Sequence, residues 1–327
     1  MAELRWHPLT KDWIMIASHR QNRPQMPKDW CPFCPGPDND KVPKSFDVYE
    51  YDNDFPALMQ TPPEPDDVET NVYKVRPAYG KCEVILYSPE HTVTLPELPE
   101  DHVRKLVDLW TERFEALRAD ENIKYVFIFE NRGAVVGVTM PHPHGQIYGY
   151  SVVPKKLELE LDSCKEHHHE TGHCLICDMI HDEVADGRRV IFENEDFIVF
   201  LPFFSEYPYG IYIAAKNHKQ YISEFTDSEK DNLAKAVREA AGTLDSLFGY
   251  TFPYMMCMYN GPVNAAEDTS DYYHFHIAFY PPMRSADKQK FNASSETGAW
   301  AHCNPTAPEA TSVELREAYK RFKESDK

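Results

Sequence analysis

The segment His142-Pro-His144-Gly-Gln146 contains the residues of this 327-residue chain whose types and spacing most directly suggest chemistry. In an extended segment the first and third residues share a face, so one imidazole can bind a metal ion while the next faces a substrate. A neutral imidazole can attack phosphorus, and the amide of Gln146 can donate to the charge that develops on phosphoryl oxygens. The spacing also allows both histidines to bind metal or to cap a strand, because two histidines separated by one residue occur in many proteins. The residues alone leave these interpretations open.

Two Cys-x-x-Cys pairs indicate metal binding in an intracellular chain. Each pair brings two thiolates to one ion, and two imidazoles would complete a tetrahedral zinc site. The predicted ligands are Cys31, Cys34, His91 and His142 in the first site, and Cys174, Cys177, His218 and His274 in the second. Because four protein ligands leave no open position, we expect both ions to be structural.

Other interpretations of the cysteines exist. The pair at Cys31 could be free thiols, whereas a thioredoxin-like pair is disfavoured because Cys31 does not stand between a strand and a helix. Five histidines crowd the second pair and could replace His218, although we interpret Glu166–Glu170 as a solvated polar segment. These histidines are His167, His168, His169, His173 and His181. The remaining cysteines are expected to be buried free thiols: Cys82, Cys164, Cys257 and Cys303.

The order of the parts repeats along the chain. After the first cysteine pair we expect a strand at 82–87, a helix at 103–117 with apolar residues at helical spacing, and strands at 125–129 and 147–153. After the second pair we expect strands at 197–201 and 210–214, a helix behind the Thr226/Glu229 capping box, and strand-like runs at 254–258 and 273–279. The repeat predicts an α+β fold with two halves from internal duplication, each an antiparallel sheet with a packed helix. We expect the halves to span residues 1–160 and 161–327.

Composition limits the function classes. The chain has 53 acidic and 34 basic residues and a formal charge of −19, which argues against nucleic acid or an anionic membrane as a partner. Basic groups that bind phosphate must therefore be concentrated in a site. Residues 1–13 hold no apolar signal-peptide core, and no run approaches the roughly 18 apolar residues of a membrane span. We expect a cytoplasmic protein.

Several segments in combination resemble the galactose-1-phosphate uridylyltransferases, a branch of the histidine-triad superfamily. The resemblance runs from about Trp6 to Tyr319 and implies two histidine-triad-like halves. Besides 142–146, the similar segments are Ser18-His-Arg20-Gln-Asn-Arg23-Pro24, Cys31–Cys34, Asn53-Asp54-Phe55, Ser88-Pro-Glu-His91, Glu130-Asn131-Arg-Gly133-Ala, Gly137-Val-Thr139-Met-Pro141, Phe279-Tyr-Pro-Pro282, Lys290-Phe291 and Glu296.

The resemblance implies a ping-pong exchange in which His144 takes uridylyl from UDP-glucose and galactose 1-phosphate then removes it. It also implies zinc, a homodimer and roles for the matching residues. Gln146 would contact the phosphoryl group, Asn53 and Asp54 the nucleoside, and Asn131, Gly137 and Thr139 the phosphates, while Arg20 and Arg23 would act across the dimer interface and Lys290, Phe291 and Glu296 would bind the hexose phosphate. The cationic residues would supply the local positive charge that an acidic chain otherwise lacks.

The chain departs from the family pattern at a second metal site, which many members build from one glutamate and three histidines. Glu160 matches the glutamate, but the histidine positions hold Tyr259, His276 and Ala278. That site cannot be intact, which disfavours iron and favours a second zinc at the Cys174 pair. Ser295 and His302 also depart, in the segment expected to bind hexose.

Two other functions compete with uridylyl transfer. A nucleotide phosphorylase of the same superfamily would use the same His144 intermediate with inorganic phosphate as acceptor or ADP-glucose as donor, and the 290–296 segment disfavours it. A zinc-stabilised binding module without catalysis is opposed by the acidity and by the lack of a basic, aromatic stripe.

Overall fold

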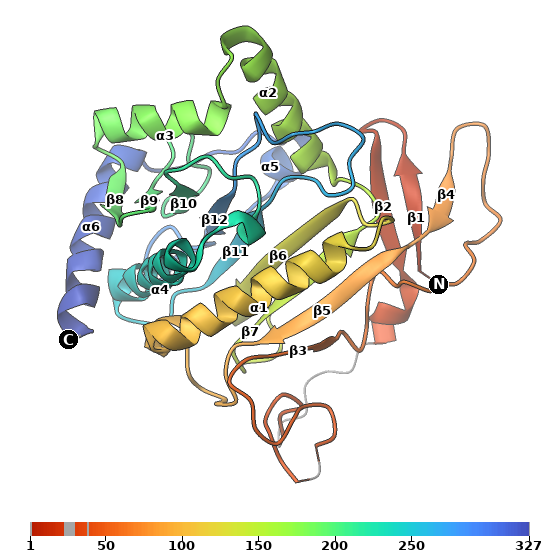
Figure 1. Ribbon diagram of the computed structural model, residues 1–327, viewed down its shortest axis with the longest axis horizontal. Coiled ribbons are helices and arrows are strands. Elements are labelled where there is room, and N and C mark those ends of the chain that lie inside the picture. The colour runs from red at the N-terminus through yellow and green to blue at the C-terminus, as the bar shows by residue number, and fades with distance from the viewer. Residues whose placement is uncertain (1, 23–29, 38, 327) are drawn as a thin grey trace.

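A large antiparallel sheet organises the chain. The computed structural model describes residues 2–22, 30–37 and 39–326, and within these a nine-stranded sheet has the order β3-β5-β7-β6-β11-β12-β10-β9-β8 (Figure 1). In that order the strands are Tyr49–Asp52, Gly80–Leu86, His144–Tyr150, Tyr125–Arg132, Tyr254–Tyr259, His276–Tyr280, Tyr212–Ala215, Phe197–Phe200 and Val190–Glu193. Every neighbouring pair is antiparallel.

Each half of the sheet contains the same unit. The first runs β5, helix α1 (Glu100–Arg118), β6, β7, and the second runs β10, helix α4 (Asp227–Phe248), β11, β12. The central strands β6 and β11 pair with each other, so the two units are placed in mirrored order about this junction. The α+β fold with two related halves is therefore confirmed. The sheet is continuous through the junction, and the division at residue 160 stays a prediction.

Helices α1 and α4 cover one face of the sheet side by side (Figure 1). The apolar positions that predicted a helix at 103–117 are all buried in the main core: Val103, Leu106, Val107, Trp110, Phe114 and Leu117. The capping box at the start of α4 is confirmed, because the Glu229 N–H donates to Thr226 Oγ1 and Thr226 N–H donates to the Glu229 carboxylate. Burial of these two apolar helix faces holds the sheet rigid beneath the site.

The opposite face of the sheet is covered by different elements in the two halves. Over the second half lie α2 (Lys155–Thr171) and α3 (Leu175–Asp186). They contact strand residues whose side chains point away from α1 and α4, such as Ile198 and Phe200. Over the first half lies a small sheet of order β2-β1-β4. Its strands are Asp12–Ala17, Ala2–His7 and Val75–Pro77.

The remaining elements are short or peripheral. Helix α6 (Pro308–Ser325) packs on α4 and β8, where Tyr319 stacks on Phe192 with ring centroids 4.3 Å apart. The other elements are α5 (Ser294–Ala299) and the 3-10 helices η1 (Ser18–Asn22), η2 (Leu95–Glu97), η3 (Ala134–Val136) and η4 (Ile222–Glu224). Within the described part of the chain, no helix combines the length and apolar character needed to cross a bilayer.

Candidate active site

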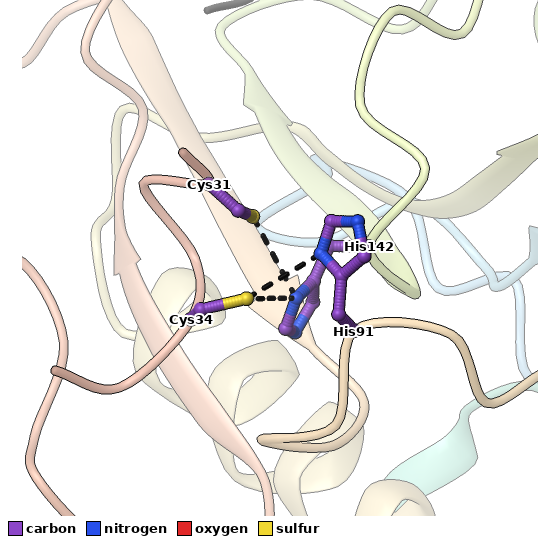
Figure 2. Close-up of side chains that lie close together, drawn as sticks. All are labelled: Cys31, Cys34, His91 and His142. Atoms are coloured by element: carbon purple, nitrogen blue, oxygen red, sulfur yellow. Dashed lines mark hydrogen bonds between the residues drawn. The ribbon is translucent and has the colours of Figure 1, made fainter. Parts of the chain in front are cut away.

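The first predicted metal group is assembled. Cys34 Sγ lies 3.4 Å from His91 Nδ1 and 3.5 Å from His142 Nδ1, and Cys31 Sγ lies 3.8 Å from His142 Nδ1 (Figure 2). Zinc bond lengths of about 2.3 Å to sulfur and 2.05 Å to nitrogen give a tetrahedral S···N edge of about 3.6 Å. The four side chains therefore fit one tetrahedrally coordinated metal ion.

Local contacts hold these ligands in place. A tight turn joins the two cysteines through the Cys34 N–H bond to the Cys31 carbonyl, and the Asn39 amide donates to the Cys34 carbonyl at 2.8 Å. The His142 Nε2–H donates to the carbonyl of Ser88 at 2.8 Å, which directs the lone pair of Nδ1 toward the thiols. Burial lowers the pKa of His142 to about 4, so its ring is the neutral form that binds metals.

His144 is the first residue of β7, one pleat beyond the metal ligand. Its Nδ1–H donates to the carbonyl of His142 at 2.8 Å, so the proton is on Nδ1 and the lone pair is at Nε2. The edge of Phe33, from the loop between the two cysteines, packs on the ring with centroids 5.3 Å apart. The loop of Cys31 and Cys34 and the strand therefore fix both the tautomer and the orientation of the ring.

A cavity of about 280 Å³ opens beside this ring. Its lining includes His144, Asn131 and Thr139, together with the loop that connects β6 to β7. Gly137 lies in that loop, outside the lining, with a φ of 83° that favours glycine. An imidazole with its lone pair at Nε2 thus stands in the wall of a cavity large enough for part of a nucleotide.

Gln146 follows on the same face of β7, and its amide oxygen accepts a hydrogen bond of 3.2 Å from the hydroxyl of Tyr148. The Arg20 guanidinium in turn donates to that hydroxyl at 3.4 Å. The sequence interpretation missed Tyr148, because only the alternation of strand residues places it beside Gln146. Arg23 lies outside the described residues.

The second predicted metal group is also assembled. Cys177 Sγ lies 3.3 Å from the Nδ1 atoms of both His218 and His274, and Cys174 completes a group whose ligand atoms all fall within 4.8 Å of one another. As in the first group, one outer nitrogen has a carbonyl partner: His218 Nε2–H donates to Ser270 at 2.7 Å. The fit to a tetrahedral ion is the same, and α3 starts at the cysteine turn.

The crowded histidines do not replace His218. Three of them lie on the last turns of α2, so the polar segment Glu166–Glu170 is helical, with its side chains exposed or half-buried. His167 Nε2 pairs with Asp178 at 2.7 Å, and His173 lies 3.5 Å from the same carboxylate. None of the five belongs to a metal-capable group among the described residues.

One more cluster of metal-capable residues lies outside both groups, at Glu50, Asp52 and Glu83. Its carboxylates already have cationic partners. Arg113 binds Glu83 at 2.6 Å and Lys81 binds Asp52 at 2.5 Å. These two cations offset two of the three carboxylate charges, and burial raises the pKa of Glu50 to about 7.

Comparison with known proteins decides the family. Residues 1–154 match the model "Galactose-1-phosphate uridyl transferase, N-terminal domain", and residues 160–302 match the corresponding C-terminal domain. The chain belongs to the galactose-1-phosphate uridylyltransferase family. It is therefore an enzyme of the nucleotidyltransferase class.

Relatives in the uridylyltransferase family match over nearly the whole chain. The galactose-1-phosphate uridylyltransferase of Thermotoga maritima is 38% identical over 318 residues, which is 97% of this chain and 98% of that protein. The Rattus norvegicus enzyme is 31% identical, covering 96% of this chain and 86% of its own length. A solved structure described as "Structure of uridylyltransferase" is 31% identical with a TM-score of 0.89, covering 98% of this chain and 99% of that chain.

An ADP-glucose phosphorylase from Arabidopsis thaliana has the same fold as this chain. Its structure superposes with a TM-score of 0.74 over 97% of this chain and 99% of that chain, at 24% identity. At that identity the likeness concerns the fold alone.

The residues that the family assigns to the nucleoside lie just after β3. Asn53 accepts a bond from the Phe55 N–H at 2.9 Å, which shapes the turn. The exposed Asp54 forms an ion pair with Lys41. Neither residue lines the cavity at His144.

The residues that the family assigns to the hexose phosphate lie beyond β12. Lys290 is buried, with its ammonium 4.9 Å from the ring centre of Tyr207, whereas Phe291 is 71% exposed. Glu296 accepts a bond from the Ala293 N–H at the start of α5. None of the three lines the cavity at His144.

At the position where the sequence predicts a lost site of one glutamate and three histidines, the structure has a closed aromatic cluster. His276 donates from Nδ1 to the carbonyl of His274 at 3.1 Å, just as His144 does two residues after His142. Here, however, the ring is buried, stacks on Tyr259 at 4.6 Å, and lies 3.4 Å from Glu160. The second half thus repeats the geometry of His144 in a buried position, and Glu160 belongs to no metal-capable group among the described residues.

Proposed function

We propose that this chain transfers uridylyl from UDP-glucose to galactose 1-phosphate by a ping-pong route through a covalent uridylyl-His144. The observation that carries the proposal is the Nδ1–H bond from His144 to the His142 carbonyl, because it leaves a nucleophilic lone pair at Nε2. Membership of the family supplies the substrate class.

In the first step the Nε2 lone pair attacks the α-phosphorus of UDP-glucose. The P–N bond forms, the P–O bond to the β-phosphate breaks, and glucose 1-phosphate leaves with that electron pair. In the second step a phosphate oxygen of galactose 1-phosphate attacks the same phosphorus and the P–N electron pair returns to Nε2. Because each leaving group is already an anion or an imidazole, neither step needs a general acid.

Gln146 serves in both steps as a donor to the phosphoryl oxygens. Its amide N–H groups stabilise the charge on those oxygens without a titratable proton. Asn131 near the end of β6 contributes a polar group, as do Gly137 and Thr139 in the loop between β6 and β7, and Asn131 and Thr139 line the cavity. Asn53 and Asp54 are proposed to bind the nucleoside.

Both metal groups are proposed to hold zinc, since two thiolates and two imidazoles form a closed tetrahedral set. Such an ion has a structural role: it anchors the loop of Cys31 and Cys34 to His142, the residue whose carbonyl sets the tautomer of His144. At the second group the ion joins the start of α3 to the strand region around His274.

The complete site is proposed to form in a homodimer. Lys290, Phe291 and Glu296 match the hexose segment of the family yet lie away from the cavity of their own chain, and Phe291 is exposed. A second copy would bring this segment to His144, whereas Arg20 contacts Tyr148 within its own chain. The cytoplasm remains the predicted location, and it suits the eight free cysteines.

Isotope exchange tests the ping-pong route. The protein is incubated with UDP-glucose and labelled glucose 1-phosphate, without any hexose acceptor. We expect label to enter UDP-glucose, because the uridylyl enzyme reacts reversibly with glucose 1-phosphate. Absence of exchange, with turnover once galactose 1-phosphate is present, would contradict the covalent route. Replacing galactose 1-phosphate by inorganic phosphate then distinguishes a transferase from a phosphorylase.

A further inference from the structure

Three groups form a chain of hydrogen bonds along one face of the active strand. Arg20 of η1 donates to the Tyr148 hydroxyl, and the same hydroxyl donates to Oε1 of Gln146, with distances of 3.4 and 3.2 Å. Tyr148 is only 7% exposed, and Phe129 packs edge-on against its ring at 5.0 Å. The phenol is therefore held in place by packing.

The direction of these bonds follows from the chemistry of the groups. A guanidinium can only donate, so it uses a lone pair of the Tyr148 oxygen and turns the hydroxyl proton away from itself. Among the described residues, the amide oxygen of Gln146 is the strong acceptor within hydrogen-bond distance of that hydroxyl. The thiol of Cys82, which pairs with Tyr148 across β5 and β7, also lies beside the hydroxyl but is a weak acceptor.

An amide has two ends, and their assignment decides what Gln146 offers to a substrate. If Oε1 faces Tyr148, the two N–H donors point elsewhere, toward the phosphoryl group that Gln146 is proposed to contact. If the amide flips, Oε1 faces the anionic phosphoryl oxygens and repels them. A donor that engages only Oε1 therefore selects the productive orientation.

We propose that Tyr148 is a positioning residue for nucleotidyl transfer, which together with Arg20 orders the amide of Gln146 so that its N–H groups face the reacting phosphoryl group. The inference rests on the proposed function for its substrate. Burial raises the pKa of Tyr148, so the hydroxyl keeps its proton at neutral pH.

Removal of the Tyr148 hydroxyl tests its positioning role by kinetics. Single-turnover uridylylation by UDP-glucose is measured for the wild type, Tyr148→Phe and the matched control Tyr150→Phe, two residues along the same face of β7. We expect Tyr148→Phe to slow the step about tenfold with a Kd for UDP-glucose within about twofold, since one orienting bond is lost. Tyr150→Phe should match the wild type. Equal rates in Tyr148→Phe and the wild type would overturn the inference.

A double-mutant cycle with Gln146→Ala separates a positioning role from a structural one. If Tyr148 acts through Gln146, Tyr148→Phe should add nothing in the Gln146→Ala background. A full tenfold loss in that background would show that the phenol acts by another path and would also overturn the inference.

An NMR measurement tests the contact between Tyr148 and the Gln146 amide without requiring turnover. With glutamine-selective ¹⁵N labelling, the side-chain amide resonances of Gln146 are assigned by their loss in Gln146→Ala. They should shift in Tyr148→Phe and stay unchanged in Tyr150→Phe, whether or not UDP-glucose reacts. If the two Gln146 amide resonances do not shift in Tyr148→Phe, the positioning role of Tyr148 is refuted. Failure of the wild type to be uridylylated would refute only the proposed function.

Discussion

At the scale of single residues, the surroundings of an imidazole decide its role in this fold. His144 and His276 make the same Nδ1–H bond to a carbonyl two residues earlier, at 2.8 and 3.1 Å. One lines a cavity with Gln146 following it on the strand. The other is buried against Tyr259 and Glu160, with Ala278 in place of the glutamine. Only His144 therefore has both a lone pair within reach of substrate and a neighbouring donor.

The first prediction contrasts these two histidines. His276→Asn should keep most of the uridylylation of His144, because the residue is sealed from substrate. It should also lower the melting temperature by several degrees, since it removes packing and leaves Glu160 with the Tyr273 hydroxyl but without His276, at about 1–3 kcal/mol. Label incorporation and a thermal melt measure the two effects. Loss of labelling in a folded His276→Asn variant would contradict the assignment of His276 as a residue without a role in uridylylation.

The second prediction concerns Glu130, a buried carboxyl on β6. Burial raises its pKa to about 7, and the Tyr254 hydroxyl donates to it at 3.2 Å. Arg132, followed by the hydroxyls of Tyr254 and Tyr87, lowers this pKa by less than burial raises it, and Asp245 raises it further. The folded state thus binds this proton more tightly than the unfolded state does.

The direction of the pH dependence of stability follows from that difference in proton binding. The stability contributed by protonated Glu130 is complete below the unfolded pKa near 4.5 and is lost as the pH rises through 7. Glu130→Gln should remove this decline, which is on the order of 3 kcal/mol. Urea unfolding at pH 5 and pH 8 measures it, with the exposed Glu170→Gln as a control that keeps the decline. An unchanged pH dependence in Glu130→Gln would show that Glu130 is ionised throughout.

At the scale of elements, strand β7 is confined between β5 and β6, and its glycines allow the close approach. A Cβ built on Gly145 would lie 2.5 Å from the Tyr87 hydroxyl and 3.1 Å from the carbonyl of Phe129. The buried Tyr87 ring and the backbone cannot both give way. The residue between His144 and Gln146 must therefore lack a side chain.

The third prediction tests this packing. Gly145→Ala should displace the strand and reduce the uridylylation rate at least tenfold, with a loss of about 1–3 kcal/mol in stability. Gly149→Ala is the control on the same strand, because its nearest obstacle is the movable end of Ile123 at 2.7 Å. It should cost less in rate and in stability. If both variants keep the wild-type rate, the spacing of β7 does not control the site.

Much of the element order could be predicted from the sequence. Apolar spacing located α1, the Thr226/Glu229 box located α4, and alternating or apolar runs located β5, β6 and β11 to within a few residues. Both metal groups followed from cysteine and histidine order. The helical end of α2 was missed because its charged residues and histidines show little apolar periodicity.

The finer parts of the site depend on contacts that no local pattern encodes. Arg20 and Tyr148 are 128 residues apart in sequence, and the tyrosine is an ordinary strand residue by type. The choice of His218 over five nearby histidines was stated from motif order, whereas its physical cause is the approach of residues 218 and 274 to within 3.3 Å of Cys177. The tertiary fold determines which of these residues come into contact.

At the scale of the whole molecule, the duplicated halves place two similar groups of cysteines and histidines in different surroundings. One group adjoins His144 through His142, and the other lies beside the buried His276. We therefore expect that the loss of either group has a different effect on activity.

The fourth prediction is that each group holds one zinc ion. Metal analysis should give two zinc ions per chain for the wild type and one for either Cys34→Ser or Cys177→Ser. Cys34→Ser should abolish uridylylation, because His142 and the turn before His144 lose their anchor. Cys177→Ser should retain labelling but melt at a lower temperature. A single zinc ion or any iron in the wild type would contradict the paired assignment.

The central claim is that the imidazole of residue 144 carries the nucleotide between two sugar phosphates. Incubation with uridine-labelled UDP-glucose alone, an alkaline quench and peptide mapping test it most directly. The account predicts one acid-labile label per chain, located on His144 and absent from a folded His144→Gly variant. Label on any other residue, or turnover by His144→Gly, would contradict it.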